Sequence, residues 1–177
     1  LGGMTSGNVF LDDFRRYRSS PTINNWDVRT KGPDPAYSRV GVISGDIAWF
    51  IGGIGDTLKN EVWNYHFDLD TWEQKPDFPV KQFGGLAFNI DGQIYAGLGK
   101  DISETCNNTI WKLNGDLSSW TQETNNNLIS GGILAGAAYN NKIYLIDDSF
   151  YMHEYDIQSK TWTRKLRING SDRDVHS

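Results

Sequence analysis

Four tryptophans recur at nearly regular intervals, and this repeat restricts the fold more than any other feature of the sequence. Trp26, Trp72, Trp120 and Trp162 stand 42 to 48 residues apart. In the last three copies an aromatic residue or a leucine precedes the tryptophan by seven positions, as Tyr65 precedes Trp72. A unit of this length with four strand-like runs is typical of a propeller blade, and no stretch shows a helical period. We therefore expect an all-β fold built from four-stranded antiparallel blades.

Tight turns divide each unit into strands. Residues 39–53, 84–99 and 133–147 each contain two apolar runs separated by a short polar turn. In the second of these segments the turn is Asp91-Gly92, a pair that tolerates the positive φ angles of a two-residue hairpin. The apolar character of both runs is typical of strands that are buried on both faces. We expect these segments to form the two inner strands of three successive blades.

The remaining connections are longer and more varied. Because neighbouring strands run antiparallel, all the short turns should lie on one face of the propeller and all the longer connections on the other, which we call the long-loop face. The connections expected there are residues 29–38, 54–59, 75–82, 100–106 and 122–130.

The second unit contains the clearest set of motifs. A Gly-Gly pair at 52–53 is followed by the strand NEVWNY at 60–65 and by Thr-Trp at 71–72. This order resembles the kelch repeat, and prolines before the inner strands, as at Pro35 and Pro79, also resemble it. The run from TWEQKPDFP into FGGLAFNIDGQIYAGLG is especially similar to kelch proteins of bacterial envelopes and secreted fractions. The resemblance implies a kelch-type β-propeller.

The units add up to about three and a half blades. Residues 1–28 supply half a blade, residues 29–74, 75–122 and 123–165 supply one blade each, and residues 166–177 form a tail or the start of the next connection. Propellers have about four to eight blades and close into a ring that leaves no free sheet edge. We therefore expect a partial ring that belongs to a longer polypeptide or is completed by another chain.

Charge and cysteine content exclude several kinds of partner and cofactor. The formal net charge of −5 argues against a nucleic-acid backbone or an anionic membrane surface as the main partner. No apolar run approaches the roughly eighteen residues of a membrane-spanning helix. Cys106 is the sole cysteine, which excludes a disulfide within the chain and a cysteine-based zinc cluster. We predict no cofactor and no metal.

Several chemically reactive side chains are better explained as structural. His66 follows Tyr65 directly and His153 precedes Tyr155 by two, so strand alternation points the two histidines to opposite faces. We expect both to be strand-surface residues and not metal ligands. Asp147-Asp148, which replaces the Gly-Gly pair of the second unit, is a weak candidate for binding a cation. The repeated aromatic residues are expected to pack between blades; they are Trp26, Trp72, Trp120, Trp162, Tyr65 and Tyr155.

The long-loop face is therefore where binding residues are expected, since loops on a rigid scaffold usually carry them. The candidates combine positive charge, negative charge, an amide and an aromatic ring. They are Arg39, Lys81, Gln82, Phe83, Lys100 and Glu104.

The leading hypothesis is a non-catalytic binding module that presents its long-loop face to a protein or glycan partner, outside the cell or on a bacterial cell surface. One alternative is a propeller enzyme, an oxidase or a sugar epimerase, with its catalytic residues in further blades. Another is an intracellular kelch substrate adaptor in the cytoplasm. No catalytic constellation is visible in these residues.

Overall fold

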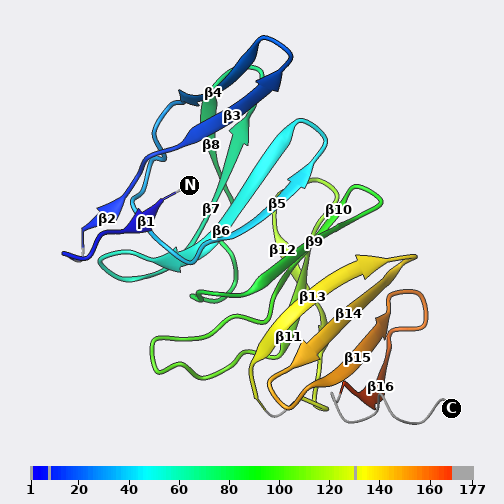
Figure 1. Cartoon of the computed structure of the whole chain (residues 1–177). Helices are drawn as coiled ribbons and strands as arrows, with labels where there is room; N and C mark the ends of the chain where they lie inside the picture. The colour runs from blue at the N-terminus through cyan, green and yellow to red at the C-terminus, as the bar shows by residue number, and fades with distance from the viewer. Residues whose placement is uncertain (1, 8, 130, 169–177) are drawn as a thin grey trace, which may run out of the picture.

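The computed structural model describes residues 2–7, 9–129 and 131–168. Over these residues it contains sixteen strands and no helix, and so no helix that could cross a membrane (Figure 1). The strands are β1 (Gly3–Met4), β2 (Phe10–Leu11), β3 (Arg15–Ser20), β4 (Ile23–Val28), β5 (Val40–Ser44), β6 (Ile47–Ile54), β7 (Leu58–His66), β8 (Thr71–Lys75), β9 (Leu86–Ile90), β10 (Gln93–Gly97), β11 (Thr109–Leu113), β12 (Trp120–Asn125), β13 (Ile133–Tyr139), β14 (Lys142–Asp147), β15 (Tyr151–Asp156) and β16 (Thr161–Arg167).

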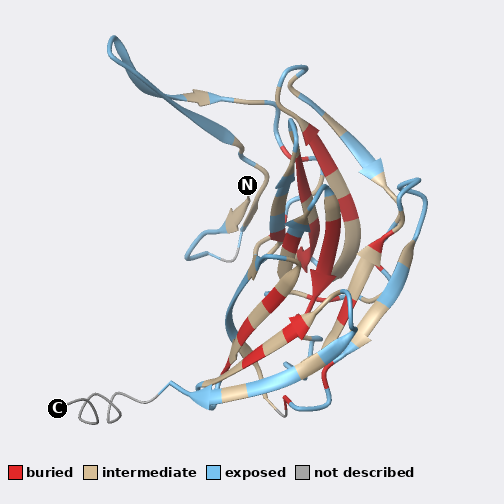
Figure 2. Cartoon of the chain, turned by 90° about the vertical axis from the view of Figure 1, so that its right-hand side faces the viewer, coloured by how far each residue is buried: buried red, intermediate tan, exposed pale blue. Residues whose placement is uncertain are grey.

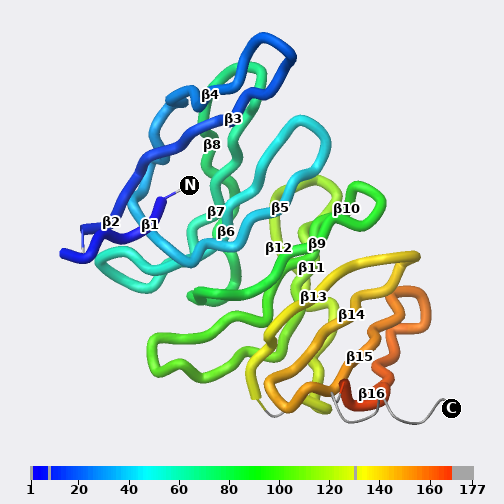
Figure 3. Tube along the Cα trace, viewed as in Figure 1, coloured from blue at the N-terminus to red at the C-terminus, as the bar shows by residue number. Residues whose placement is uncertain are grey.

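The strands form antiparallel sheets in which neighbours along the chain are neighbours in the sheet. Three sheets have four strands, in the orders β5-β6-β7-β8, β9-β10-β11-β12 and β13-β14-β15-β16, and the pairs β3-β4 and β1-β2 precede them. Figure 3 shows the chain completing one sheet before it enters the next. The first strands β5, β9 and β13 contact one another in turn, so the three sheets fan out from them in a propeller-like arrangement.

The expected all-β fold with four-stranded antiparallel sheets is confirmed. The described residues do not close a ring. β16 continues to Arg167, two residues into the segment expected to be a tail. The rest of that tail from residue 169 onward, and the expected element ends at Leu1 and Ser130, lie outside the described residues.

The tight turns have the backbone geometry that their residues favour. Asp91 and Gly92 have φ angles of 52° and 81°, and Asn140 and Asn141 have φ angles of 49° and 56°. Positive φ at both central residues is the requirement of a hairpin turn that follows the natural twist of the strands. These two turns explain why β9 pairs with β10, and β13 with β14, without a shift of register at the turn.

The repeated tryptophans tie each sheet to the one before it. The indole Nε1 of Trp72 donates to the Thr30 carbonyl, and that of Trp162 donates to Oγ1 of Thr124. Trp120 donates in the same way to the carbonyl of Pro76. In every case the acceptor lies at the outer strand of the preceding sheet, or just beyond its end. The expectation that these three tryptophans pack between blades therefore agrees with the structure.

Trp26 differs from the other three tryptophans. It is 63% exposed, and the ring it lies against is that of Tyr17 on the adjacent strand, at 5.1 Å between centroids. Strands β3 and β4, which carry these residues, are exposed along almost their whole length (Figure 2). Trp72 contacts Phe50 of β6 and Phe14, just before β3, whereas among the described residues Trp26 contacts no aromatic ring other than that of Tyr17. The expected packing of Trp26 between blades is therefore not found.

The glycine pair at the end of β6 allows the β5–β8 sheet to approach closely the connection that leads into the β9–β12 sheet. Gly52 has a φ angle of +62°, and a Cβ atom added there would lie 2.5 Å from the carbonyl oxygen of Gln82. The next residue, Gly53, donates its N–H to that same carbonyl at 2.8 Å. A side chain at Gly52 would therefore break a hydrogen bond between the β5–β8 sheet and this connection as well as strain the backbone.

Candidate functional site

Arg39 is buried where the first long connection enters β5. Its side chain is 4% exposed and forms an ion pair of 2.6 Å with Asp34. It also donates through Nη1 to the Gly52 carbonyl at 2.9 Å, and Lys59 contacts the other carboxylate oxygen of Asp34. The guanidinium is therefore engaged in joining the connection at residues 29–38 to the end of β6.

Gln82 is also buried, at the junction of the β5–β8 and β9–β12 sheets. Its Oε1 accepts a hydrogen bond of 3.2 Å from the Gly99 amide, and its backbone amide donates to Lys59. Its side-chain Nε2 has no hydrogen-bond partner among the described residues. As placed, Gln82 and Arg39 present no functional group on the long-loop face.

The other four predicted residues lie at the surface of the long-loop face. Phe83 and Lys100 form an isolated antiparallel bridge with reciprocal backbone hydrogen bonds of 2.9 and 3.0 Å. The Lys100 ammonium lies 3.9 Å from the Glu104 carboxylate, and both side chains are exposed to solvent. Lys81 is exposed as well. The structure thus brings Phe83, Lys100 and Glu104 together and leaves Lys81 at the edge of this group.

The connection at residues 100–106 has an ordered turn. The carboxylate of Asp101 accepts hydrogen bonds from the amides of Ser103 and Thr105 at 2.8 and 2.9 Å. The two ends of the connection are joined by a second bridge, between Lys100 and Cys106. This internal bonding holds the tip in one conformation, which reduces the entropy that a partner would have to remove on binding.

Three neighbouring loops carry exposed apolar side chains that the sequence analysis did not select. Ile102 is 70%, Leu128 is 46% and Phe150 is 50% exposed. They lie on the connections β10–β11, β12–β13 and β14–β15, which antiparallel alternation places on the long-loop face. A signal was present in the sequence for two of them, because Ile102 is the single large apolar residue of 100–106 and Phe150 that of 148–150. Leu128 instead stands beside Ile129, which is buried.

Gly132 shows that these three loops touch. Its amide donates to the Asp148 carboxylate at 2.9 Å, and a Cβ atom added to it would lie 3.5 Å from Sγ of Cys106 and 3.9 Å from Cε of Lys100. Residues from β10–β11, β12–β13 and β14–β15 therefore converge around one glycine. We call this group of connections the loop cluster: residues 100–106, 126–129, 131–132 and 148–150.

His153 is not the strand-surface residue that its position in the sequence predicts. It is fully buried, and its Nε2 lies 2.9 Å from Oδ2 of Asp147. Oδ1 of Asp147 accepts hydrogen bonds from the amides of Ser149 and Tyr151. Burial raises the pKa of Asp147, but the hydrogen bonds from His153 and these amides outweigh it, so the pKa lies below its usual value.

Neither histidine belongs to a cluster suited to a metal. His66, which is partly exposed, lies 3.3 Å from Glu73 in a surface pair. Within the described part of the chain no three His, Cys, Asp or Glu side chains are grouped so that they could hold a metal ion. The Asp147 carboxylate, one of the two candidate cation ligands, is occupied by protein donors.

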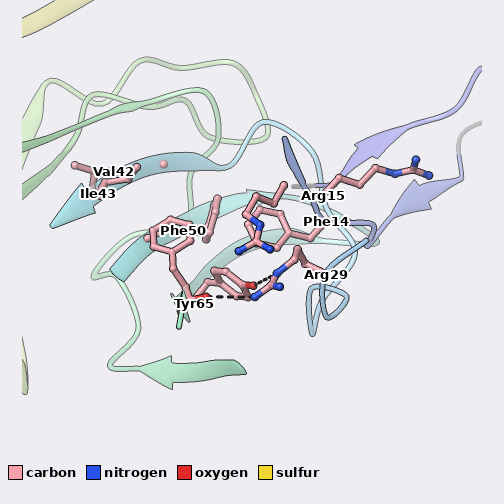
Figure 4. Close-up of a pocket in the computed structure, with 11 residues that line it drawn as sticks. Phe14, Arg15, Arg29, Val42, Ile43, Phe50 and Tyr65 are labelled. Atoms are coloured by element: carbon pink, nitrogen blue, oxygen red, sulfur yellow. Dashed lines mark hydrogen bonds between the residues drawn. The ribbon is translucent and has the colours of Figure 1, made fainter. Parts of the chain in front are cut away.

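A groove of about 650 Å³ lies beside the β5–β8 sheet, away from the loop cluster. Its wall on the sheet side includes Gly41, Ile43 and Phe50, and its opposite side includes Phe14 and Arg15. Figure 4 shows these walls together with the hydrogen bond of 2.8 Å that Arg29 donates to the Tyr65 hydroxyl. The groove is mostly apolar and has arginines at its rim.

Comparison with known proteins supports the fold, but it identifies no relative of established function. No family model matches the sequence, and no curated protein is similar enough to indicate a relative. Among solved structures, the chain is similar to that described as the structure of YjhT, with a TM-score of 0.76 at 14% sequence identity. The match covers 95% of this chain and 62% of the YjhT chain, so the chain spans less than two thirds of that structure. At this identity the likeness concerns the fold alone.

Proposed function

We propose that this protein is a non-catalytic binding module whose loop cluster holds a protein partner. The observation that carries the proposal is the convergence of three connected loops, each with an exposed apolar side chain, around Gly132. Ile102, Leu128 and Phe150 supply apolar contact area. Lys100 and Glu104 beside them supply charges of both signs.

This combination suits a protein surface. Protein interfaces combine an apolar centre with a polar rim, and the bound state is favoured when the loops are already ordered. The internal hydrogen bonds of residues 100–106 supply that order. A glycan partner would depend instead on stacking against the aromatic rings of Phe83 and Phe150.

The kelch assignment and the location of the protein are part of the same proposal. The motifs at 52–53, 60–65 and 71–72 support a kelch-type propeller, and the similarity of residues 71–99 to envelope and secreted kelch proteins supports a place outside the cell or on a bacterial surface. The partial ring supports completion by further blades, in the same polypeptide or in another chain.

The experiment compares Ile102→Asp with Leu69→Asp. Both residues are exposed and apolar, at 70% and 65%, but Leu69 lies on the short β7–β8 turn of the opposite face. Proteins captured from the surface fraction of the source cells by the wild-type chain should be retained by Leu69→Asp and lost with Ile102→Asp. Equal retention by both variants would contradict the proposal. Binding to a glycan array that depends on Phe150 would replace the protein partner with a glycan.

A further inference from the structure

The repeat supplies an internal reference for the groove beside Gly41. In the β5–β8 sheet Gly41 of β5 pairs with Phe50 of β6, and in the β13–β16 sheet Gly136 of β13 pairs with Leu145 of β14. Two residues along, Ile43 pairs with Ala48 and Ala138 pairs with Ile143. Gly41 and Phe50 therefore occupy the positions that Gly136 and Leu145 occupy two sheets later.

At the later position, the inner strands of the preceding sheet cover the glycine. A Cβ atom added to Gly136 would lie 2.6 Å from Cδ1 of Leu86 and 3.1 Å from Cζ of Phe88, both on β9. Leu145, its partner, is fully buried. The hairpin formed by β9 and β10 thus fills the space in front of β13 and β14, with an aromatic ring over the glycine.

At Gly41 the same space is open. The three heavy atoms nearest to a Cβ added there belong to Phe50 and to the backbone of Trp49, both in the same sheet, at 3.8 to 3.9 Å. Ile43 is exposed, whereas Ala138, its counterpart, is packed against the core that contains Phe88. The groove is therefore the space that an inner hairpin fills elsewhere in this chain.

The backbone beside the groove also lacks a partner. β11, the third strand of its sheet, is hydrogen-bonded to β10 and β12, but the corresponding strand β3 pairs with β4 alone among the described residues. An open strand edge next to an apolar wall is the arrangement to which an added strand binds, through backbone hydrogen bonds and side-chain pockets.

We infer that the groove is a docking site for a polypeptide β-hairpin that pairs with the free edge of β3 and places an aromatic side chain over Gly41. The chemistry of this occupant is that of the chain's own inner hairpins, with Phe88 as the model for the aromatic residue. A small amphiphile would fill the apolar volume but could not form the ladder of backbone hydrogen bonds that an added strand forms with β3.

The test uses a labelled synthetic peptide of residues 85–99 added to the full chain. Fluorescence anisotropy should show saturable binding, and a peptide with Phe88→Ala should bind at least about tenfold more weakly because the ring over Gly41 is lost. In the protein, Gly41→Leu should weaken binding by a similar factor. Gly115→Leu is the matched control, since a Cβ added there meets no atom within 4 Å.

A covalent version keeps the test decisive if the free peptide aggregates. Residues 85–97 are placed directly before Gly2, so that they continue into β1, and thermal unfolding is measured. The melting temperature should rise, and Gly41→Leu should remove the rise. An unchanged melting temperature, or peptide binding that is insensitive to both substitutions, overturns the inference. A dimer of the wild-type chain that Gly41→Leu converts to a monomer overturns it in favour of a second copy.

Discussion

The imidazole of His153 and the carboxylate of Asp147 form a buried pair, with 2.9 Å between Nε2 and Oδ2, at the point where the second unit has its first glycine of the Gly-Gly pair. Because an ionised carboxylate only accepts hydrogen bonds, Nε2 carries the hydrogen. The other ring nitrogen, Nδ1, is buried without a partner among the described residues.

This pair leads to a prediction about stability at neutral pH. His153→Leu leaves the Asp147 carboxylate buried without one of its donors and should lower the free energy of unfolding by about 3 kcal/mol. His66→Leu, which disrupts a surface pair, should change it by less than about 1 kcal/mol. Urea titration of both variants tests the difference. Equal effects on the free energy of unfolding would show that the buried pair stabilises the fold no more than the surface pair does.

The same pair predicts how stability changes with acid. Since the folded-state pKa of Asp147 lies below its unfolded value, the carboxylate stabilises the fold above the unfolded pKa, and this contribution is lost as pH falls through the folded pKa. Asp147→Asn should therefore reduce stability at pH 7 and flatten its decline below about pH 4. Unfolding curves at several pH values would contradict this if wild type and variant decline in parallel.

The burial of His153 follows from two sequence expectations that were not combined. Residues two apart on a strand share a face, and Tyr155, two residues after His153, was expected to pack between blades. His153 shares its face with Tyr155, which is fully buried against the preceding sheet. The partner, Asp147, stands where the repeat has Gly52, and that departure was a second signal in the sequence.

The tryptophan repeat predicts a contrast between two residues of the same type. Trp72 contacts the rings of Phe14, Phe50 and Tyr65 and donates to the Thr30 carbonyl, whereas Trp26 is mostly exposed. Trp72→Ala should lower the free energy of unfolding by about 3 kcal/mol or more, and Trp26→Ala by less than about 1 kcal/mol. Chemical denaturation of the two variants measures both values. Similar losses would mean that Trp26 is buried in solution.

The period of the repeat was sufficient to predict the strands, the tight turns and the four-stranded sheets. It could not predict that Trp26 is exposed. The position of a residue in the repeat indicates which neighbouring strands its side chain would contact, but it does not show that those strands are present. Arg39 and Gln82 were selected as loop-face residues for a similar reason. Composition marks a loop as polar, but it does not reveal which polar side chains fold back beneath it.

Two glycines with similar backbone geometry should respond differently to alanine. Gly52 and Gly45 have φ angles of +62° and +58°, but a Cβ atom would lie 2.5 Å from the Gln82 carbonyl at Gly52 and within 4 Å of no atom at Gly45. Gly45→Ala should lower the free energy of unfolding by about 1 kcal/mol through backbone strain alone. Gly52→Ala should lower it by at least about 3 kcal/mol. Equal losses of unfolding free energy would show that the backbone around Gln82 moves away from Gly52 without a cost in stability.

Arg39 and Lys81 were both predicted as binding residues, but their substitutions should differ in their effect on stability. Arg39→Ala removes the ion pair with Asp34 and the hydrogen bond to Gly52, and should lower the free energy of unfolding by about 2 kcal/mol. Lys81→Ala, at an exposed position, should change it by less than about 0.5 kcal/mol. Thermal unfolding of the two variants provides the comparison. If Arg39→Ala left the free energy of unfolding unchanged, the ion pair with Asp34 would not be stabilising, and the guanidinium would be free to bind a ligand.

The measurement that tests binding by the long-loop face most directly is the affinity of the double variant Phe83→Ala, Lys100→Ala for the partner captured by the wild-type chain. Both side chains reach the surface beside Glu104 and neither belongs to the two buried cores. The account predicts an affinity at least about tenfold lower with an unchanged free energy of unfolding. An unchanged affinity would contradict the assignment of binding to the long-loop face.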